Sequence, residues 1–306
     1  ADVPLAEPDE EADEEANSIV NLYDAFGTPP DGMVHAFGFS ALIRYRGKTI
    51  LFDAGSDAST FRRNVRALGV RLGEVDLAVL SHAHADHFSG FAYFREMNPT
   101  APIYAPADPF LGGRVAFDVR GSHGDAGNDL PPEQRYFDGD EQRMEGFESS
   151  GILGSEKVVY LEKSAEIAPG ITLIVTRSDA AGYFVANPQN ADEVEKIGLP
   201  ELSLALSTTE GDVLVVGCAH SGIETIIVEA RKLLGRPIDL VAGGYHLIPH
   251  EPRFIRALAA WMREKPAVRQ VAPAHCTGHA AFAIFRELYG DNYRFLGLGA
   301  RVPFAP

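Results

Sequence analysis

Four side chains of metal-binding type lie close together at His82, His84, Asp86 and His87. They follow residues 75–80, a short apolar run rich in branched side chains that is typical of a buried strand. Alternate side chains of a strand point the same way, so His82 and His84 can face one point in space. Asp86 can then cap the helix that follows, with His87 in its first turn. Imidazole and carboxylate ligands suit zinc or another borderline divalent ion, so this stretch predicts a metal site.

Three later predicted strands, at residues 212–216, 238–242 and 269–272, also run into segments that contain glycine and histidine. In layered α/β folds, residues at the carboxyl ends of strands converge on one edge, where ligands bind. Eight of the ten histidines lie in these three segments and the first one, which favours a single shared site. The later segments contribute Cys218, His220, His246, His250, His275, Cys276 and His279.

The composition limits the classes of partner. Hydrophobic residues make up 45% of the chain, as in an ordinary globular domain, and no apolar run approaches the roughly eighteen residues of a membrane span. The net charge is −16, and residues 1–16 contain eight acids and no base. We therefore expect residues 1–17 to form a flexible acidic arm. The absence of a basic stripe argues against nucleic acid as a partner.

Two cysteines, Cys218 and Cys276, are too few for a disulfide framework. The sequence opens Ala1-Asp2-Val3-Pro4 without a methionine, which fits a processed export signal. An exported or periplasmic location is therefore favoured over a cytoplasmic one, although a start chosen for expression would look the same.

The order of the predicted elements indicates the architecture. Strands are predicted at residues 18–23, 39–45 and 48–53, after which strands and helices alternate up to a last strand at 293–298. This order predicts an α/β fold in which two mixed β-sheets pack face to face with helices outside, as a single domain over 18–306.

Residues 108–156 contain many glycines and prolines and no sustained periodicity, which predicts an insertion that covers the site. A surface excursion is the alternative. The segment contains large apolar side chains, and Phe110 and Phe147 are candidates for contacting an organic substrate at about 1.5–3 kcal/mol each. Arg177 and His279 are candidates for binding an anionic substrate group, although each could equally be an ordinary surface or packing residue.

The pattern His82-Xaa-His84-Xaa-Asp86-His87 after an apolar strand resembles the signature of the metallo-β-lactamase superfamily of hydrolases. Within it, residues 217–223, 243–247 and 275–278 resemble the branch named for a dihydropterin ribofuranosyl-aminobenzene phosphate synthase, many members of which are metal-dependent hydrolases. The resemblance covers nearly the whole chain from about residue 18. It implies the four-layer αββα sandwich of that superfamily.

The same resemblance implies roles for single residues. Asp53 matches an aspartate that orients a metal ligand through a hydrogen bond. Cys218 falls where the family usually has aspartate, and His275 matches the final histidine. The family's middle histidine is missing, because the corresponding strand ends Val-Thr-Arg-Ser-Asp at Asp179. His220 is the natural substitute and Asp179 a weaker one.

A second departure lies near the start, where the branch usually has a histidine directly before Gly-Xaa-Ser. Phe37 stands there instead, and His35 is displaced. The two departures leave open both the number of ions and the substrate.

The resemblance leads to an expected ligand set and mechanism. We expect one ion between His82, His84 and His220, and a second between Asp86, His87 and His275, with Cys218 between or beside them. Cys218 could instead be a small buried residue with no metal role. We expect one or two zinc ions, with manganese or iron as alternatives, and a metal-bound water with a pKa of about 7 that attacks as hydroxide. Asp86 and His246 are the candidate catalytic residues, His246 as the group that donates a proton to a leaving group.

The expected function is therefore a metal-dependent hydrolase of a small organic molecule, with ester, lactone, phosphoester and activated aryl halide substrates all open. One alternative is a non-catalytic or metal-dependent small-molecule-binding protein, and another is a di-iron redox protein. We expect a small-molecule substrate as partner, no nucleic acid and no membrane, and a homodimer is a candidate assembly.

Overall fold

The computed structural model describes residues 17–107, 114–115, 147–148, 157–185 and 196–306. The first sheet is made of β1 (Ser18–Tyr23), β2 (Ser40–Tyr45), β3 (Lys48–Phe52), β4 (Leu77–Val79), β5 (Ile103–Pro106), β8 (Val158–Leu161) and β15 (Arg301–Pro303). Its strand order is β15-β1-β2-β3-β4-β5-β8. The β3–β4, β4–β5 and β5–β8 pairs are parallel, and the other pairs are antiparallel.

The second sheet is made of β9 (Ala165–Ala168), β10 (Ile171–Val185), β11 (Lys196–Ser207), β12 (Asp212–Val216), β13 (Ile238–Gly244) and β14 (Gln270–Ala274), in the order β14-β13-β12-β11-β10-β9. A separate two-stranded pair joins β6 (Arg114–Val115) to β7 (Phe147–Glu148). The β12–β13 and β13–β14 pairs are parallel, so the carboxyl ends of these three strands lie side by side.

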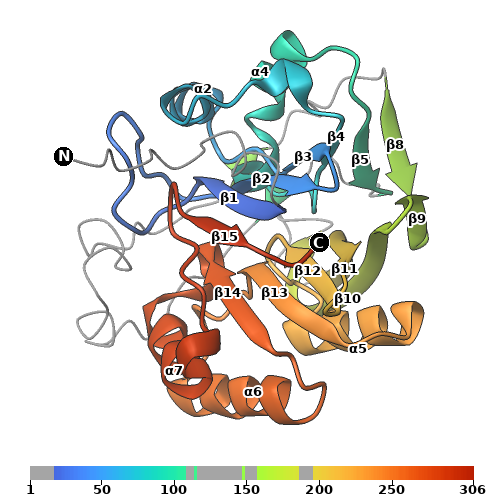
Figure 1. Ribbon diagram of the computed structural model, residues 1–306, viewed down its shortest axis with the longest axis vertical. Coiled ribbons are helices and arrows are strands. Elements are labelled where there is room, and N and C mark those ends of the chain that lie inside the picture. Colours follow the sequence, from blue (N-terminus) through green and yellow to red (C-terminus); the bar gives the residue numbers. More distant parts are fainter. Residues whose placement is uncertain (1–16, 108–113, 116–146, 149–156, 186–195) are drawn as a thin grey trace, which may run out of the picture.

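The helices cover the outer faces of the two sheets. They are α2 (Ala58–Ala67), α3 (Ala85–Phe88), α4 (Phe91–Met97), α5 (Ile223–Leu234), α6 (Pro252–Glu264) and α7 (His279–Tyr289), with short 3-10 turns η1 (Leu72–Glu74), η4 (His275–Thr277) and η5 (Gly290–Asn292). In Figure 1, α2 and α4 lie beyond the first sheet, and α5, α6 and α7 lie beyond the second. The chain therefore forms the four-layer αββα sandwich that the sequence predicts. None of the described helices is long and apolar enough to cross a membrane.

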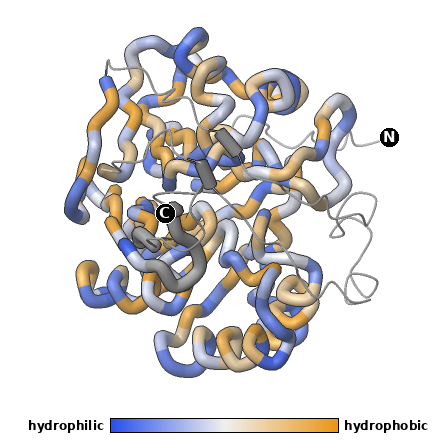
Figure 2. The backbone as a smooth tube through the Cα atoms, turned by 180° about the vertical axis from the view of Figure 1, so that it is seen from behind, coloured by the Kyte–Doolittle hydropathy of each residue, from blue (hydrophilic) through white to orange (hydrophobic). Residues whose placement is uncertain are grey.

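Three buried clusters fill the spaces between these layers. The central one joins the facing sides of the sheets, for example Ile43 and Phe52 of the first and Leu204 and Val215 of the second. The other two lie beneath the outer helices. The helices alternate hydrophobic and hydrophilic segments along the tube, as expected of elements with one buried face (Figure 2).

Two sequence-based expectations require correction: the strand at residues 293–298 and the helix cap at Asp86. Residues 293–298 form only an isolated bridge through Tyr293, and β15 occupies the sheet edge instead. The segment is held by hydrogen bonds from the Asn21 side chain to the Leu296 carbonyl (2.9 Å) and from the Leu298 amide to the Phe26 carbonyl (3.0 Å). Asp86 lies within the first turn of α3, whose N-cap is His84, so it does not cap the helix.

Most of the predicted insertion at 108–156, including Phe110, lies outside the described residues. Phe147 is described only as part of β7. The roles of both phenylalanines in substrate selection, and of residues 1–17 as a flexible arm, stay predictions.

Asn64 provides a test of how the fold holds the segment before β2. Its buried side chain accepts a hydrogen bond from the Val34 amide (2.8 Å) and donates to the carbonyls of Val34 (3.0 Å) and Leu22 (3.1 Å). Asn64→Ala leaves these backbone groups unpaired, so we expect the free energy of unfolding to fall by about 2–4 kcal/mol in urea denaturation. Arg66→Gln, on the exposed face of α2, is the matched control and should shift it by no more than about 0.5 kcal/mol. Equal stability of the two variants would contradict this assignment.

Candidate metal centre

The Asp53 carboxylate organises one side of the candidate site. Asp53 follows β3 and is fully buried. One of its oxygens accepts from the Ser81 amide (2.6 Å), and the other accepts from the Ser81 hydroxyl (2.6 Å) and pairs with His87 Nδ1 (2.7 Å). Because His87 Nδ1 is engaged in this way, its Nε2 faces the site. This is the orienting contact that the family resemblance predicts for Asp53.

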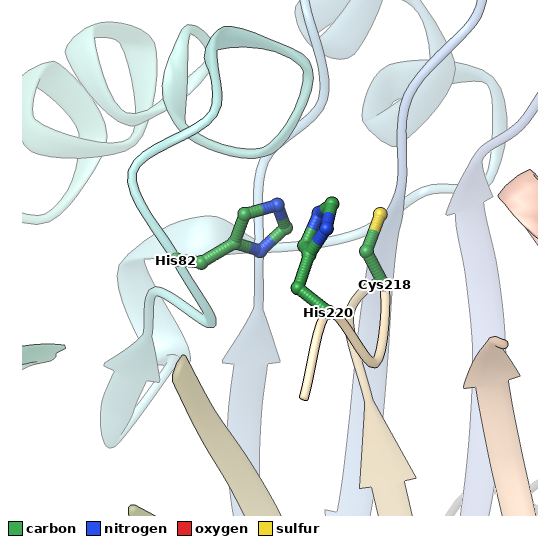
Figure 3. Close-up of side chains that lie close together, drawn as sticks. All are labelled: His82, Cys218 and His220. Carbon is green, nitrogen blue, oxygen red and sulfur yellow. The ribbon is translucent and has the colours of Figure 1, made fainter. Parts of the chain in front are cut away.

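His82, His84 and His220 come together from two sheets. His82 Nε2 lies 3.0 Å from His84 Nδ1, and the His220 ring centroid lies 4.7 Å from that of His82 and 4.6 Å from that of His84. Ser81 Oγ is 2.8 Å from His82 Nδ1, which directs Nε2 of that ring inward. Figure 3 shows His82, from the loop after β4, beside His220 and Cys218, from the loop after β12.

Asp86, His87, His275 and Cys218 form the adjoining part of the site. Asp86 Oδ2 lies 3.3 Å from His275 Nε2 and 3.5 Å from His87 Nε2. His87 Nε2 lies 3.1 Å from Cys218 Sγ. The structure thus brings together all seven residues that the sequence singled out as ligands, and each is 1% exposed or less.

The donor set fits a divalent ion. An ion held tetrahedrally at about 2.0–2.1 Å separates imidazole nitrogens by about 3.3 Å, close to the spacings found here. Ligand atoms of His82, Cys218 and His220 all lie within 4.8 Å of one another, as do those of His87, Cys218 and His275. Asp86 Oδ1 is buried without a hydrogen-bond partner among the described residues, which is costly unless a cation or another polar group meets it.

Burial keeps two imidazoles in the neutral form that a metal requires. It lowers the pKa of His84 to about 3, and burial together with the neighbouring histidines lowers the pKa of His82 well below its usual range. Burial alone would raise the pKa of Asp86, but His87 and His275 outweigh it and hold that pKa far below its usual range. Burial would lower the pKa of His275, but Cys276 and Asp86 raise it to about 9.

The two thiols respond differently to these surroundings. Burial and the neighbouring Cys276 raise the pKa of Cys218. Burial would also raise the pKa of Cys276, but the contact with the Cys218 thiol and the nearby His275 outweigh it, and the pKa of Cys276 is lowered. The pair therefore shares one negative charge more readily than two.

The backbone at the site adopts an uncommon conformation at four places. Asp53, Ala219, His246 and His275 have φ angles of 57°, 54°, 51° and 48°. Each lies just after a strand, where the chain turns sharply and the side chain or its neighbour faces the site. Left-handed backbone at residues other than glycine costs energy and clusters at functional sites, which independently marks this edge of the sandwich.

Two buried carboxylates hold the ligand loops and were missed by sequence reasoning. Glu201 of β11 accepts hydrogen bonds from the amides of His220 (3.0 Å) and Ser221 (2.6 Å). Asp24 accepts from the amide of His275 (3.1 Å), and burial raises the pKa of Asp24 to about 7. An acidic residue inside the apolar run 199–206 was the available signal for Glu201.

Of the remaining predicted residues, His246 borders the centre, and the others lie elsewhere or outside the described residues. The His246 ring lies 4.4 Å from the His220 ring, so it borders the centre. His279 begins α7 and is half-buried. Arg177 is exposed on the β10–β11 hairpin, where its Nε donates to the Gly198 carbonyl (3.0 Å). The Asp179 side chain lies outside the described part of the chain, so its candidacy as a ligand stays a prediction.

Comparisons with known proteins agree with this geometry. A family model described as the metallo-beta-lactamase superfamily matches residues 35–159. A protein of Methanocaldococcus jannaschii named 7,8-dihydropterin-6-methyl-4-(beta-D-ribofuranosyl)-aminobenzene-5'-phosphate synthase is 28% identical over 286 residues, covering 88% of this chain and 90% of that protein. An uncharacterised protein of the same organism is 27% identical over 260 residues, covering 85% and 91%.

Solved structures share the fold. A crystal structure described as a metal-dependent hydrolase of the beta-lactamase superfamily aligns with a TM-score of 0.70 at 22% identity, covering 95% of this chain and 100% of the other. Zn(2+)-bound PqqB from Methylobacterium extorquens aligns with a TM-score of 0.53 at 12% identity, covering 94% and 100%. Residues 35–159 thus match the metallo-beta-lactamase superfamily model, and the chain has the fold of solved structures described as members of that superfamily.

Proposed function

We propose that the protein is a metal-dependent hydrolase of a small organic molecule, with zinc as the first candidate ion. The observation that supports this most directly is the convergence of five buried imidazoles, the Asp86 carboxylate and the Cys218 thiol, with separations that fit divalent coordination. A divalent ion bound there would supply Lewis acidity and a water activated for attack near neutral pH.

The chain's own residues would position the reacting groups. The carboxylate of Asp53 fixes the ring of His87, and Ser81 fixes that of His82. The Nε2 atoms of both rings are therefore oriented toward the site before an ion binds. Asp86 lies between His87 and His275 and can accept a hydrogen bond from a water molecule through Oδ1. His246, at the border of the centre, is the candidate proton donor for a leaving group.

A second candidate function is a synthase reaction. It is favoured by the name of the M. jannaschii relative, which matches over nearly its whole length. The two functions are separated by assaying metal-loaded protein on a panel of esters, lactones, phosphodiesters and activated aryl halides, and for formation of the compound in that relative's name. Turnover of the panel alone supports the hydrolase. Metal without any turnover favours a binding protein, and iron with visible absorbance favours a di-iron protein.

The first prediction from this centre concerns the two histidines with oriented rings. We expect His82→Ala and His87→Ala each to weaken metal binding and lower the hydrolysis rate by more than about 100-fold with the fold retained, because each removes a direct ligand. Metal content by mass spectrometry, kinetics and circular dichroism are the measurements. His250→Ala, which removes a half-buried ring stacked on Phe254, is the matched control and should keep its metal. Full metal and full rate in both variants would overturn the centre.

The second prediction concerns the replacement for the missing middle histidine. His220→Ala should deplete bound metal far more than Asp179→Asn, because the His220 ring already packs against His82 and His84. Competitive titration with a chelating dye gives the two affinities. The reverse ranking would assign the role to Asp179.

The third prediction concerns Glu201. Each oxygen of the Glu201 carboxylate now accepts a hydrogen bond from one backbone amide, that of His220 or that of Ser221. Glutamine keeps the shape but replaces one oxygen with an NH2 group that cannot accept, so the His220 loop loses one of these hydrogen bonds. We expect Glu201→Gln to weaken metal affinity by about 10- to 100-fold, the range for residues that orient a ligand. Glu210→Gln, at an exposed carboxylate paired with Arg269, is the control and should leave the affinity unchanged. Equal affinities in the two variants would reduce Glu201 to a packing role.

A further inference from the structure

A pair of buried thiols lies beside the candidate centre. Cys276 Sγ is 3.3 Å from Cys218 Sγ, neither forms a disulfide, and the side chains are 4% and 1% exposed. Cys218 follows β12 and Cys276 lies in η4 after β14. The two strands flank β13, whose end carries His246, so three neighbouring parallel strands deliver a thiol, an imidazole and a second thiol to one place.

The loops that carry His246 and Cys276 are joined to each other by hydrogen bonds. The amides of Leu247 and Ile248 donate to the Cys276 carbonyl at 3.0 and 3.3 Å. The Tyr245 amide donates to the Thr277 hydroxyl at 3.0 Å. The two side chains are therefore held in a fixed relation by backbone contacts on both sides.

A glycine makes room for the second thiol. A Cβ atom at Gly244 would lie 2.8 Å from Cys276 Sγ, closer than atoms of neighbouring side chains approach. The Cys276 thiol therefore occupies space that only glycine leaves at that position. The thiol points toward Cys218 and His246.

The three groups make a soft donor set. Cys218, His246 and Cys276 each offer one ligand atom, and these three atoms all lie within 4.8 Å of one another. Thiolate sulfurs bound to one tetrahedral zinc ion are about 3.8 Å apart, so the present pair needs to open by only about half an ångström. Two sulfurs and one imidazole nitrogen favour thiophilic ions over magnesium or calcium.

We infer that Cys218, His246 and Cys276 form a separate thiolate-rich position for a thiophilic divalent ion, adjoining the histidine centre through the shared Cys218 sulfur. An ion there occupies His246, which then no longer serves as the proton donor assigned above. Cys218 belongs to three candidate ligand groups: with His82 and His220, with His87 and His275, and with His246 and Cys276. Because a single thiolate bridges two ions at most, an ion held by His246 and Cys276 competes for Cys218 with an ion held by His87 and His275. The inference rests on the proposed centre only through that shared sulfur.

The experiment is a cadmium titration of the full chain, stripped of metal by a chelator and kept reduced. Thiolate-to-cadmium charge transfer in the ultraviolet reports sulfur ligands alone. We expect Cys276→Ser to lose about half of the wild-type intensity at saturation, since one of two thiolates is gone, and Cys218→Ser to lose a comparable share. Thr277→Ser keeps the hydroxyl that accepts from Tyr245, and as the matched control it should match the wild type.

A Cys276→Ser titration identical to the wild type would overturn the inference. So would purification of the native protein with a Cys218–Cys276 disulfide and no cadmium signal before reduction. If Cys276→Ser does not fold, X-ray absorption at the zinc edge of the wild type decides instead. An ion with two sulfur neighbours supports the inference, and no more than one per ion refutes it. Failure of the hydrolase function appears in the turnover panel and leaves this sulfur count unaffected, so the two outcomes are separable.

Discussion

The buried carboxylate of Asp53 is the contact on which the candidate centre depends most. It joins the end of β3 to the loop after β4 through Ser81 and to α3 through His87. A buried carboxylate is tolerated only when its oxygens are paired, and here the partners are Ser81, which contacts His82, and His87 itself. Gly217 allows this arrangement, since a Cβ there would lie 2.2 Å from Ser81 Oγ. The contacts that orient the His82 and His87 rings therefore also require the close approach of Gly217, at the end of β12, to Ser81.

A second link extends this network to the other sheet. The amide of Leu202, in β11, donates to the Ser81 carbonyl at 2.7 Å. The preceding residue, Glu201, holds the loop that carries His220. Two consecutive residues of β11 therefore contact both the loop that carries His82 and the loop that carries His220. The turn after β12 thereby brings His220 beside His82 and His84, whereas the family resemblance predicts a histidine near the end of β10, the strand that pairs with Glu201.

The sequence was sufficient for the layers and for most of the candidate ligands, because both follow from short-range patterns. Apolar runs marked the strands, and histidines directly after them marked the common edge. It was not sufficient for contacts that depend on tertiary placement. Cys276 lies 58 residues from Cys218 in the chain, and only the parallel order of β12, β13 and β14 brings them to 3.3 Å. Residues 293–298 do not form the expected strand for a similar reason, because buried hydrogen bonds with Asn21 and Phe26 hold that segment without a ladder.

The unpaired Asp86 oxygen and the crowded neutral imidazoles have a consequence for the protein's lifetime. A folded chain that buries polar groups without partners is less stable than one in which a bound ion meets them. An ion that binds only the folded form adds about 2.7 kcal/mol at a free concentration of 100 times its dissociation constant. That is a sizeable part of the 5–15 kcal/mol by which domains of this kind are typically stable. The supply of free metal in the surroundings would then control how much of this protein survives proteolysis, independently of how much is made.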